Sequence, residues 1–322
     1  MTARELPPNT DLGHGITCID PLQGRPGMAC CYLLARQGEY AFIEAGTSHG
    51  VPGLLALLSA RGIRADQVRY VIPTHVHLDH AGGVGTLMGA LPEAQLVVHP
   101  RGARHMIDPA KLIAGATAVY GEAVVQAQYG EIRGVPAARV IEAADGHEVR
   151  LGDGVLRFFD SPGHARHHFC IFDPVSQGFF TGDTFGLSYR EFDSAKGPFL
   201  FPTTTPVQFE PEAWQHTLDR LLAAEPKRMY LTHYGAVSPV PALAETLRQG
   251  LRRYQALARE LADVDNRHTR LRDALTQLTL EQLKAHGSPV DEATSRTLLA
   301  LDMELNAQGL GVWLDAQRAG NA

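Results

Sequence analysis

Residues 74–80 read Thr-His-Val-His-Leu-Asp-His, and this stretch decides both the expected fold and the expected chemistry. The β-branched residues directly before it predict a short strand. Because side chains two residues apart on an extended chain face the same side, His75 and His77 can present their imidazoles to one point just past the strand end. Asp79 and His80 follow as the chain turns toward a helix, and the two glycines that come next but one permit the turn.

Four metal-binding side chains within six residues are hard to explain as core packing. Histidines clustered in a core would each need a hydrogen-bond partner, and burial would disfavour their charged form. A divalent ion satisfies such a cluster as a whole. The motif therefore predicts a metal site in preference to a structural cluster.

Three more metal-binding side chains each follow an apolar run that predicts a strand, namely His164, Asp183 and His233. Because α/β sheets expose their functional loops at strand ends, these residues are candidates for further ligands. Each is a weak signal alone, since a single histidine after a strand is more often a surface or capping residue. Together with the first motif, the three would complete the shells of two metal ions.

The motifs H-x-H-x-D-H, Gly163-His164, Gly182-Asp183-Thr184 and Thr232-His233 stand in the order found in one family. Over roughly residues 28–240 the sequence resembles the metallo-β-lactamase superfamily, in particular its glyoxalase II-like hydrolases with two metal ions. The resemblance implies an α/β fold, a four-layer αββα sandwich with the site at one edge, between two β-sheets. It also implies a first metal bound by His75, His77 and His164, a second bound by Asp79, His80 and His233, and Asp183 bridging both.

The sequence departs from the family pattern at Glu44-Ala45-Gly46, where the acid is usually aspartate. An acid at this place can orient a ligand histidine without binding the metal, and we assign this role to Glu44. Glutamate is one methylene longer than aspartate, which leaves its partner open.

Several other residues near the predicted ligands have two interpretations. Tyr234 follows a predicted ligand directly and could donate a hydrogen bond to a developing oxyanion, or simply pack. His49 and Phe185 are candidates for substrate contact. His167 and His168 could line the entrance of the site or form a solvated turn.

The segment 185–209 has little regular periodicity, yet it holds five of the twelve phenylalanines. So many aromatic residues argue against disorder, and a long loop in a compact domain is usually functional. The segment is interpreted either as a lid or pocket wall for a substrate with apolar bulk, or as a packed loop that covers a sheet edge.

The composition changes after residue 240, so we predict a catalytic domain over 1–240 and a C-terminal helical extension over 241–322. Leucines at helical spacing between Leu243 and Leu261 predict a core face, which could equally form the interface of a homo-oligomer. A third helix is expected to begin at Ser288 as its N-cap. Whether these helices cap the site is left open.

The predicted chemistry is hydrolysis by a metal-bound hydroxide, without a covalent intermediate. Two divalent ions about 3.5–4 Å apart can share a bridging water and lower its pKa to about 7. Asp183 would hold the metals together and orient the nucleophile, and Asp79 could steer the proton after attack. The ligand types favour zinc, although iron and manganese also suit them. Family members cleave thioesters, lactones, other esters and phosphodiesters, so the small-molecule substrate is left open.

Two other functions remain as alternatives. One is a mononuclear iron dioxygenase that acts on persulfides, a relative that keeps the H-x-H-x-D-H motif. The predicted second metal shell argues against it. The other is a regulatory protein that keeps the metals with little turnover.

The composition excludes several classes of protein. The chain has 322 residues, 44% of them hydrophobic and 20% charged, which is typical of a soluble globular protein and not of a disordered one. A net charge of −6 without a basic cluster argues against nucleic acid as a partner. No apolar run is long enough to cross a membrane. Four cysteines without a C-x-x-C motif and a start without an apolar leader predict buried, reduced thiols in a cytoplasmic protein.

Overall fold

The computed structural model describes residues 6–204 and 206–320. Residues 1–5 lie outside this range. They belong to the start of the chain, where the sequence predicts no apolar leader. The chain divides into two compact units. Unit 1 comprises the residues up to Asp160 together with His167–Gly182 and Lys227–Ala236, and unit 2 comprises Ser161–Arg166, Asp183–Pro226 and the residues from Val237 onward. The predicted division into a catalytic domain and a C-terminal extension at residue 240 stays a prediction, and unit 2 includes two segments that precede that residue.

The first sheet of unit 1 has seven strands in the order β1-β2-β3-β4-β5-β6-β7. The first four are antiparallel neighbours and the last four are parallel ones. Their bounds are Asn9–Asp11, Ile16–Ile19, Cys31–Arg36, Glu39–Ile43, Val68–Ile72, Gln95–Val98 and Val140–Glu142. The strand predicted before the histidine motif is therefore β5, and it ends two residues before Thr74.

The second sheet has the order β13-β12-β11-β10-β9-β8. β8 to β11 are antiparallel, whereas β11 and β12 run parallel. In sequence order from β8 the bounds are Glu148–Leu151, Gly154–Asp160, Phe169–Asp173, Gly178–Gly182, Arg228–Leu231 and Gly235–Val237. Because β11 and β12 are parallel, Asp183 and His233 follow strands that end at the same edge of this sheet.

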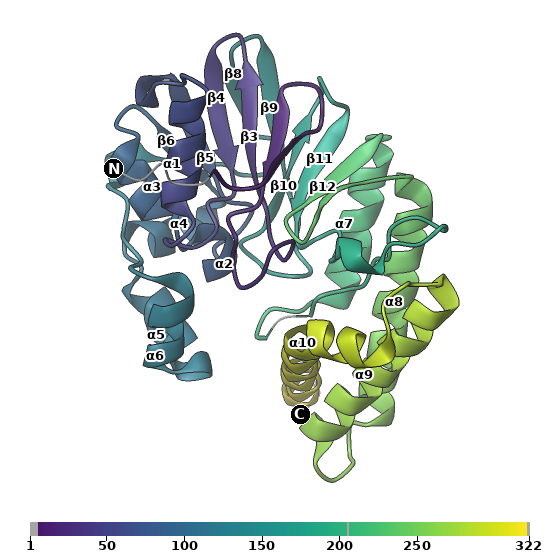
Figure 1. Cartoon of the computed structure of the whole chain (residues 1–322). Helices are drawn as coiled ribbons and strands as arrows, with labels where there is room; N and C mark the ends of the chain where they lie inside the picture. Colours follow the sequence, from purple (N-terminus) through teal and green to yellow (C-terminus); the bar gives the residue numbers. More distant parts are fainter. Residues whose placement is uncertain (1–5, 205, 321–322) are drawn as a thin grey trace. The chain divides into compact units, whose positions relative to one another are not determined.

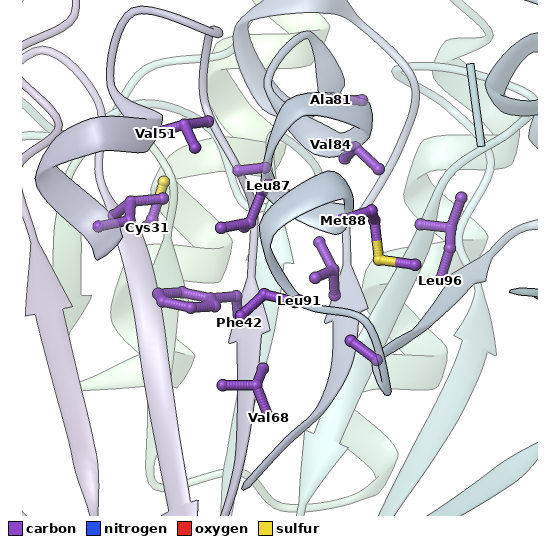
Figure 2. Packing of buried hydrophobic residues seen from close by; sticks show 14 of the residues in the cluster. Cys31, Phe42, Val51, Val68, Ala81, Val84, Leu87, Met88, Leu91 and Leu96 are labelled. Atoms are coloured by element: carbon purple, nitrogen blue, oxygen red, sulfur yellow. The ribbon is translucent and has the colours of Figure 1, made fainter. Parts of the chain in front are cut away.

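The helices whose residues all belong to unit 1 are α1 to α6, with the bounds Val51–Ala60, Leu78–Ala81, Val84–Ala90, Pro100–Ile107, Ala110–Tyr120 and Glu122–Tyr129. One hydrophobic cluster joins α1, α3 and α4 to the first sheet, as Figure 2 shows around Phe42 and Leu87. Alternate residues of the same strands, such as Tyr32 and Ile43, form a second cluster with Phe158 and Phe180 of the other sheet. Period-two alternation thus places both faces of the first sheet in a core.

These layers agree with the expected α/β architecture, with two mixed sheets and a helical layer on the first of them (Figure 1). The helix expected after the histidine motif, α3, begins at Val84, and a separate short helix, α2, precedes it. All four cysteines are free and buried, as predicted. Within the described residues, no helix has the length and apolar character needed to cross a membrane.

Unit 2 contains α7 (Pro211–Ala223), α8 (Val240–Glu260), α9 (Arg267–His286) and α10 (Glu292–Gly320). The leucine stripe of α8 is buried at Leu243, Leu247 and Leu251, which confirms its interpretation as a core face. The third helix begins later than predicted. Asp291, not Ser288, caps it by accepting a hydrogen bond from the backbone N–H of Thr294 at 2.9 Å.

The aromatic segment 185–209 is packed within unit 2. Its five phenylalanines are at most 5% exposed, and Tyr189 donates a hydrogen bond to the Asp302 carboxylate of α10. Phe199 contacts His286 of α9 with ring centroids 5.4 Å apart, and Phe209 contacts Trp313 of α10 at 6.0 Å. The packed-loop interpretation therefore holds for these side chains, with helices in place of the expected sheet edge.

Candidate metal centre

The histidine motif, residues 74–80, lies between the end of β5 and the middle of α2. His75 is fully buried and its Nε2 lies 2.8 Å from Nδ1 of His77, so the two rings converge on one point as the alternation predicts. His77 is the N-cap of α2, and Asp79 and His80 lie inside this helix rather than in an open turn. The helix places His80 against His75, with ring centroids 4.0 Å apart.

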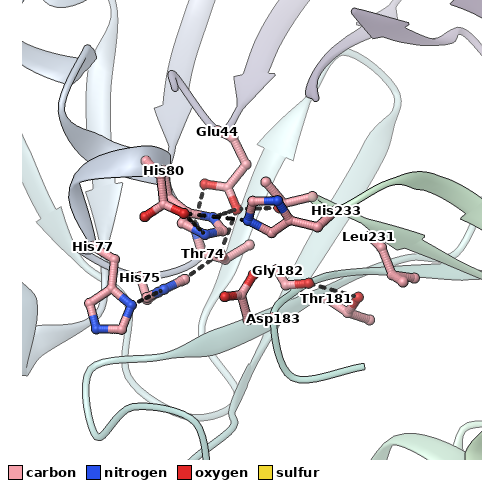
Figure 3. A network of polar contacts seen from close by, with 12 residues as sticks. Glu44, Thr74, His75, His77, His80, Thr181, Gly182, Asp183, Leu231 and His233 are labelled. Carbon is pink, nitrogen blue, oxygen red and sulfur yellow. Dashed lines mark hydrogen bonds and ion pairs between the residues drawn. The ribbon is translucent and has the colours of Figure 1, made fainter. Parts of the chain in front are cut away.

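Asp79, His80 and His233 form a group that could hold a metal ion, with one ligand atom from each within 4.8 Å of the others. Oδ2 of Asp79 lies 3.4 Å from Nε2 of His80 and 3.4 Å from Nε2 of His233. Figure 3 shows His80 and His233 side by side, although they come from α2 and from the end of β12. Two imidazole nitrogens and a carboxylate oxygen are a donor set that suits zinc, iron or manganese.

The Asp79 carboxyl is ionised in this environment. Burial raises its pKa, but the imidazoles of His80 and His233 lower it by more, so that the pKa lies well below the usual range. The side chain is still 32% exposed, which leaves one of its faces open to solvent. The group thus offers a carboxylate oxygen beside two imidazole nitrogens.

The second nitrogen of each histidine in this group is held by the protein. Nδ1 of His80 lies 3.0 Å from Oε1 of Glu44, and Nδ1 of His233 lies 2.7 Å from the carbonyl oxygen of Met28. The Asp20 carboxylate closes the loop that carries Met28 by accepting bonds from two backbone N–H groups of that loop. When Nδ1 donates its hydrogen, Nε2 carries the lone pair and can bind a metal.

Glu44 is only 1% exposed and has a left-handed backbone, with φ of +64°. Besides His80, its carboxylate accepts hydrogen bonds from the backbone N–H of Thr74 at 3.1 Å, the Thr74 hydroxyl at 2.5 Å and the Thr232 hydroxyl at 2.9 Å. Every partner of this carboxylate can donate. Such contacts are those of a residue that orients a ligand without binding the metal.

The two threonines that hold the Glu44 carboxylate, Thr74 and Thr232, are candidate site residues that the sequence analysis did not single out. Thr74 also contacts Nδ1 of His75 through its hydroxyl at 3.1 Å, so it links that ring to Glu44. Thr232 holds the same carboxylate from the end of the second sheet. The signal that could have found them is the repeated dipeptide Thr-His, which occurs at 74–75 and at 232–233.

His168 is fully buried, so its interpretation as part of a solvated turn is wrong. Its ring stacks on that of His75, with centroids 4.7 Å apart and 24° between the planes. Gly182 lies against the same place with φ of +48°, and a Cβ there would lie 2.3 Å from the Thr74 hydroxyl oxygen and 2.7 Å from Nε2 of His168. The glycine of the Gly-Asp-Thr motif is therefore required by the close approach of these two side chains.

In unit 2, His164 and Asp183 lie next to each other. Nε2 of His164 is 3.4 Å from Oδ2 of Asp183, and both side chains are buried. Nδ1 of His164 lies 3.2 Å from the carbonyl oxygen of Thr203. His164 follows β9 by four residues and Asp183 follows β11 directly, so the chain presents both just past strand ends.

Trp214 of α7 contacts both of the loops that carry His164 and Asp183. Its Nε1–H donates to the carbonyl oxygen of Thr184 at 2.6 Å, one residue after Asp183. A Cβ at Gly163 would lie 2.4 Å from the Trp214 Cβ, so only glycine permits this contact one residue before His164. The fully buried indole thus sets the position of both side chains.

Trp214→Phe is expected to lower the free energy of unfolding by about 2 kcal/mol, since it leaves the buried Thr184 carbonyl without its donor. It should also weaken metal binding by freeing the turn that carries Asp183. Denaturant titration and metal analysis of the folded variant measure the two effects. Phe209→Leu is the control, because Phe209 packs on Trp214 at 6.1 Å without a hydrogen bond. Equal metal binding by both variants would contradict this role of the indole.

The three candidates for substrate contact lie in different surroundings. His49 is exposed and sits against Gly130 at the end of α6. Tyr234 is half-buried and packs against the cluster between the sheets. Phe185 is fully buried in unit 2, so its contact with a substrate would require rearrangement of the aromatic segment. All three assignments stay predictions.

Comparison with known proteins agrees with this geometry. The family model of the metallo-beta-lactamase superfamily matches residues 24–233. The chain belongs to this superfamily. A metallo-beta-lactamase fold-containing protein of Sulfurisphaera tokodaii, ST1585, is 28% identical over 230 residues, which are 70% of this chain and 80% of that protein. The crystal structure of ST1585 superposes with a TM-score of 0.65 over 92% of this chain and 98% of that one, at 23% identity.

Two further relatives are named for hydrolytic activities. A hydroxyacylglutathione hydrolase of Maricaulis maris is 32% identical over 52% of this chain and 51% of its own length. An atrochrysone carboxyl ACP thioesterase of Aspergillus fumigatus is 27% identical over 51% of this chain and 43% of its own length. The chain therefore spans about half the length of these two relatives. The superfamily includes hydrolases such as these.

Proposed function

We propose that the protein is a metal-dependent hydrolase with a dinuclear centre that cleaves a small-molecule ester, thioester, lactone or phosphodiester. The observation that carries the proposal is the convergence of Asp79, His80 and His233, with both histidines held through Nδ1. Such an arrangement leaves three donor atoms directed at one point. These three residues would bind one metal ion.

The other ion would be bound by His75, His77 and His164, with Asp183 between the two ions. The convergence of His75 on His77 supports this assignment in unit 1, and the proximity of His164 to Asp183 supports it in unit 2. Every one of these side chains follows a strand of one of the two sheets, as the family motifs require. That the two units bring them to one centre is part of the proposal.

Divalent ions bound there would supply a water nucleophile activated at neutral pH and would polarise the bond that is cleaved. The protein's own residues hold the geometry. Glu44 fixes the ring of His80, and the Met28 carbonyl fixes that of His233. Asp79 would act as a ligand and hydrogen-bond acceptor, since its Oδ2 lies 3.4 Å from Nε2 of both His80 and His233.

Thioesters are the substrate class to test first. Two relatives are named as a hydroxyacylglutathione hydrolase and an ACP thioesterase, and both names denote action on a thioester. The dioxygenase alternative uses one iron ion, and the convergent group of Asp79, His80 and His233 favours a second metal. Removal of the C-terminal helices would not be a clean test of the regulatory alternative, because α9 and α10 pack on the aromatic segment within unit 2.

The test is elemental analysis of the purified protein, followed by assays with thioesters, lactones and phosphodiesters. We expect two metal ions per chain, loss of hydrolysis after treatment with a chelator, and recovery on adding zinc, manganese or iron. One iron per chain with oxygen uptake on a persulfide would instead support the dioxygenase. Two metals without hydrolysis of any substrate would support the regulatory protein.

A further inference from the structure

Asn306 of α10 is fully buried and contacts the backbone of a segment about a hundred residues earlier in the chain. Its Oδ1 accepts a hydrogen bond from the backbone N–H of Thr204 at 2.6 Å, and its Nδ2 donates to the carbonyl oxygen of Pro202 at 3.3 Å. The Thr204 hydroxyl lies 3.1 Å from the backbone carbonyl oxygen of Asn306 and 3.2 Å from its side-chain Oδ1. One amide side chain therefore satisfies a donor and an acceptor on both sides of Thr203.

Thr203 is the residue whose carbonyl oxygen lies 3.2 Å from Nδ1 of His164. The peptide groups before and after it are both held by Asn306, so the direction of its carbonyl is fixed. A carbonyl oxygen can only accept, so Nδ1 of His164 must be the donor. Nε2 of His164 then carries the lone pair, and it lies 3.4 Å from Oδ2 of Asp183.

We infer that Asn306 is a positioning residue for His164, which it controls through the Thr203 carbonyl. The inference rests on the proposed function, in which His164 is a metal ligand. It gives the C-terminal helices a direct part in the centre, because α10 sets the tautomer and the ring orientation of one ligand. Hydrogen-bonded partners of ligand histidines change metal affinity by about 10–100-fold when they are removed.

A merely structural role is the competing explanation, since a buried amide that satisfies backbone groups also stabilises a fold. The two explanations differ in what a folded variant does. Loss of stability alone would leave the metal sites unchanged in the molecules that remain folded. Loss of positioning would change the affinity and the geometry of the site that contains His164 while the other site keeps its properties.

Thr279→Val provides a matched control. Thr279 of α9 is fully buried in the same unit, and its hydroxyl donates to the Leu275 carbonyl of its own helix at 2.9 Å. Its loss removes a buried hydrogen bond inside α9 and leaves the bonds of Asn306 to residues 202 and 204 in place. The control variant is therefore expected to lose stability and to keep both metal sites.

The experiment measures metal binding by the full-length Asn306→Ala protein in competition with a chromophoric chelator, and records the visible spectrum of the cobalt(II)-loaded form. We expect one of the two ions to bind up to about 10-fold more weakly, the lower end of the loss caused by removing a direct partner of a ligand, with a changed cobalt spectrum, while Thr279→Val matches the wild type. A folded Asn306→Ala protein with wild-type affinity and spectrum would overturn the inference. Absence of two metal ions from the wild type would instead overturn the proposed function.

Asn306→Leu keeps the test decisive if Asn306→Ala does not fold. This variant has a side chain of similar size, so it leaves no cavity, but it loses both bonds to the backbone of residues 202 and 204. We expect the same ion to bind more weakly, with the same spectral change. Wild-type affinity for both ions in folded Asn306→Leu would count against positioning by Asn306.

Discussion

Glu44→Gln is expected to lower metal affinity and turnover by about 10–100-fold while the protein stays folded. The carboxylate receives hydrogen bonds from Thr74, His80 and Thr232 through both of its oxygens. A glutamine side chain must direct its NH₂ group at one of these donors, and two donors cannot bond. Because Oε2, within the described residues, accepts only from the Thr74 N–H, the NH₂ group clashes with the fewest donors at that position. The neutral amide oxygen then holds Nδ1 of His80 more weakly than the carboxylate does, so Nε2 loses its defined direction. Competition with a chelator and steady-state kinetics measure the two effects.

Two matched variants separate this effect from a loss of charge. Glu148→Gln neutralises a glutamate of β8 whose side chain is 48% exposed and pairs with Arg157, and surface pairs of this kind contribute little. Glu44→Asp keeps the charge and supplies the acid that is usual in the family. We expect the first to behave as wild type and the second to retain more activity than Glu44→Gln. Equal activity of Glu44→Gln and wild type would show that Glu44 does not orient His80.

The candidate ligands could be named from the sequence because their signal is local. His75 and His77 alternate on one extended stretch, and the predicted convergence agrees with the 2.8 Å between their nitrogens. The strands before His164, Asp183 and His233 were readable as short apolar runs that end at a polar residue. Each boundary depends on only a few neighbouring residues, which is why propensity and pattern suffice there.

Contacts between distant segments could not be predicted in the same way. The hydroxyl of Thr232 meets the carboxylate of Glu44 across 188 positions, and Asn306 meets Thr204 across 102. Neither pair follows a period or a spacing rule, because tertiary packing alone brings the segments together. The burial of His168 could not be predicted from the sequence either. A turn that packs against the ring of another residue has the same composition as a solvated turn.

The starting residue of a helix is a third feature that the sequence did not predict. Ser288 and Asp291 are both residues that favour the N-cap position, and the proline at 289 favoured the first of them. In the structure Asp291 bonds both the N–H and the hydroxyl of Thr294, at 2.9 and 2.8 Å. Two bonds from a charged acceptor are stronger than the single bond a serine can accept, which explains the later start.

Asp183→Asn is expected to reduce turnover by at least about 100-fold, the upper end of the loss caused by removing a mere partner of a ligand. Only a carboxylate offers two anionic oxygens that can bind two ions at once, whereas the amide nitrogen of asparagine cannot bind a metal. The substitution keeps the size of the side chain, which is 5% exposed, so the fold should persist. Metal analysis should show both ions bound more weakly.

The control for Asp183→Asn is Asp219→Asn, which removes one negative charge from the same unit. Asp219 is 65% exposed and pairs with Arg248 at the surface, so its loss should leave metal content and rate unchanged. A loss of only one ion from Asp183→Asn would assign Asp183 to a single metal and refute the bridge. Full metal content at an unchanged rate would place Asp183 outside the centre, because a bridging oxygen has no substitute among the neutral groups that would remain.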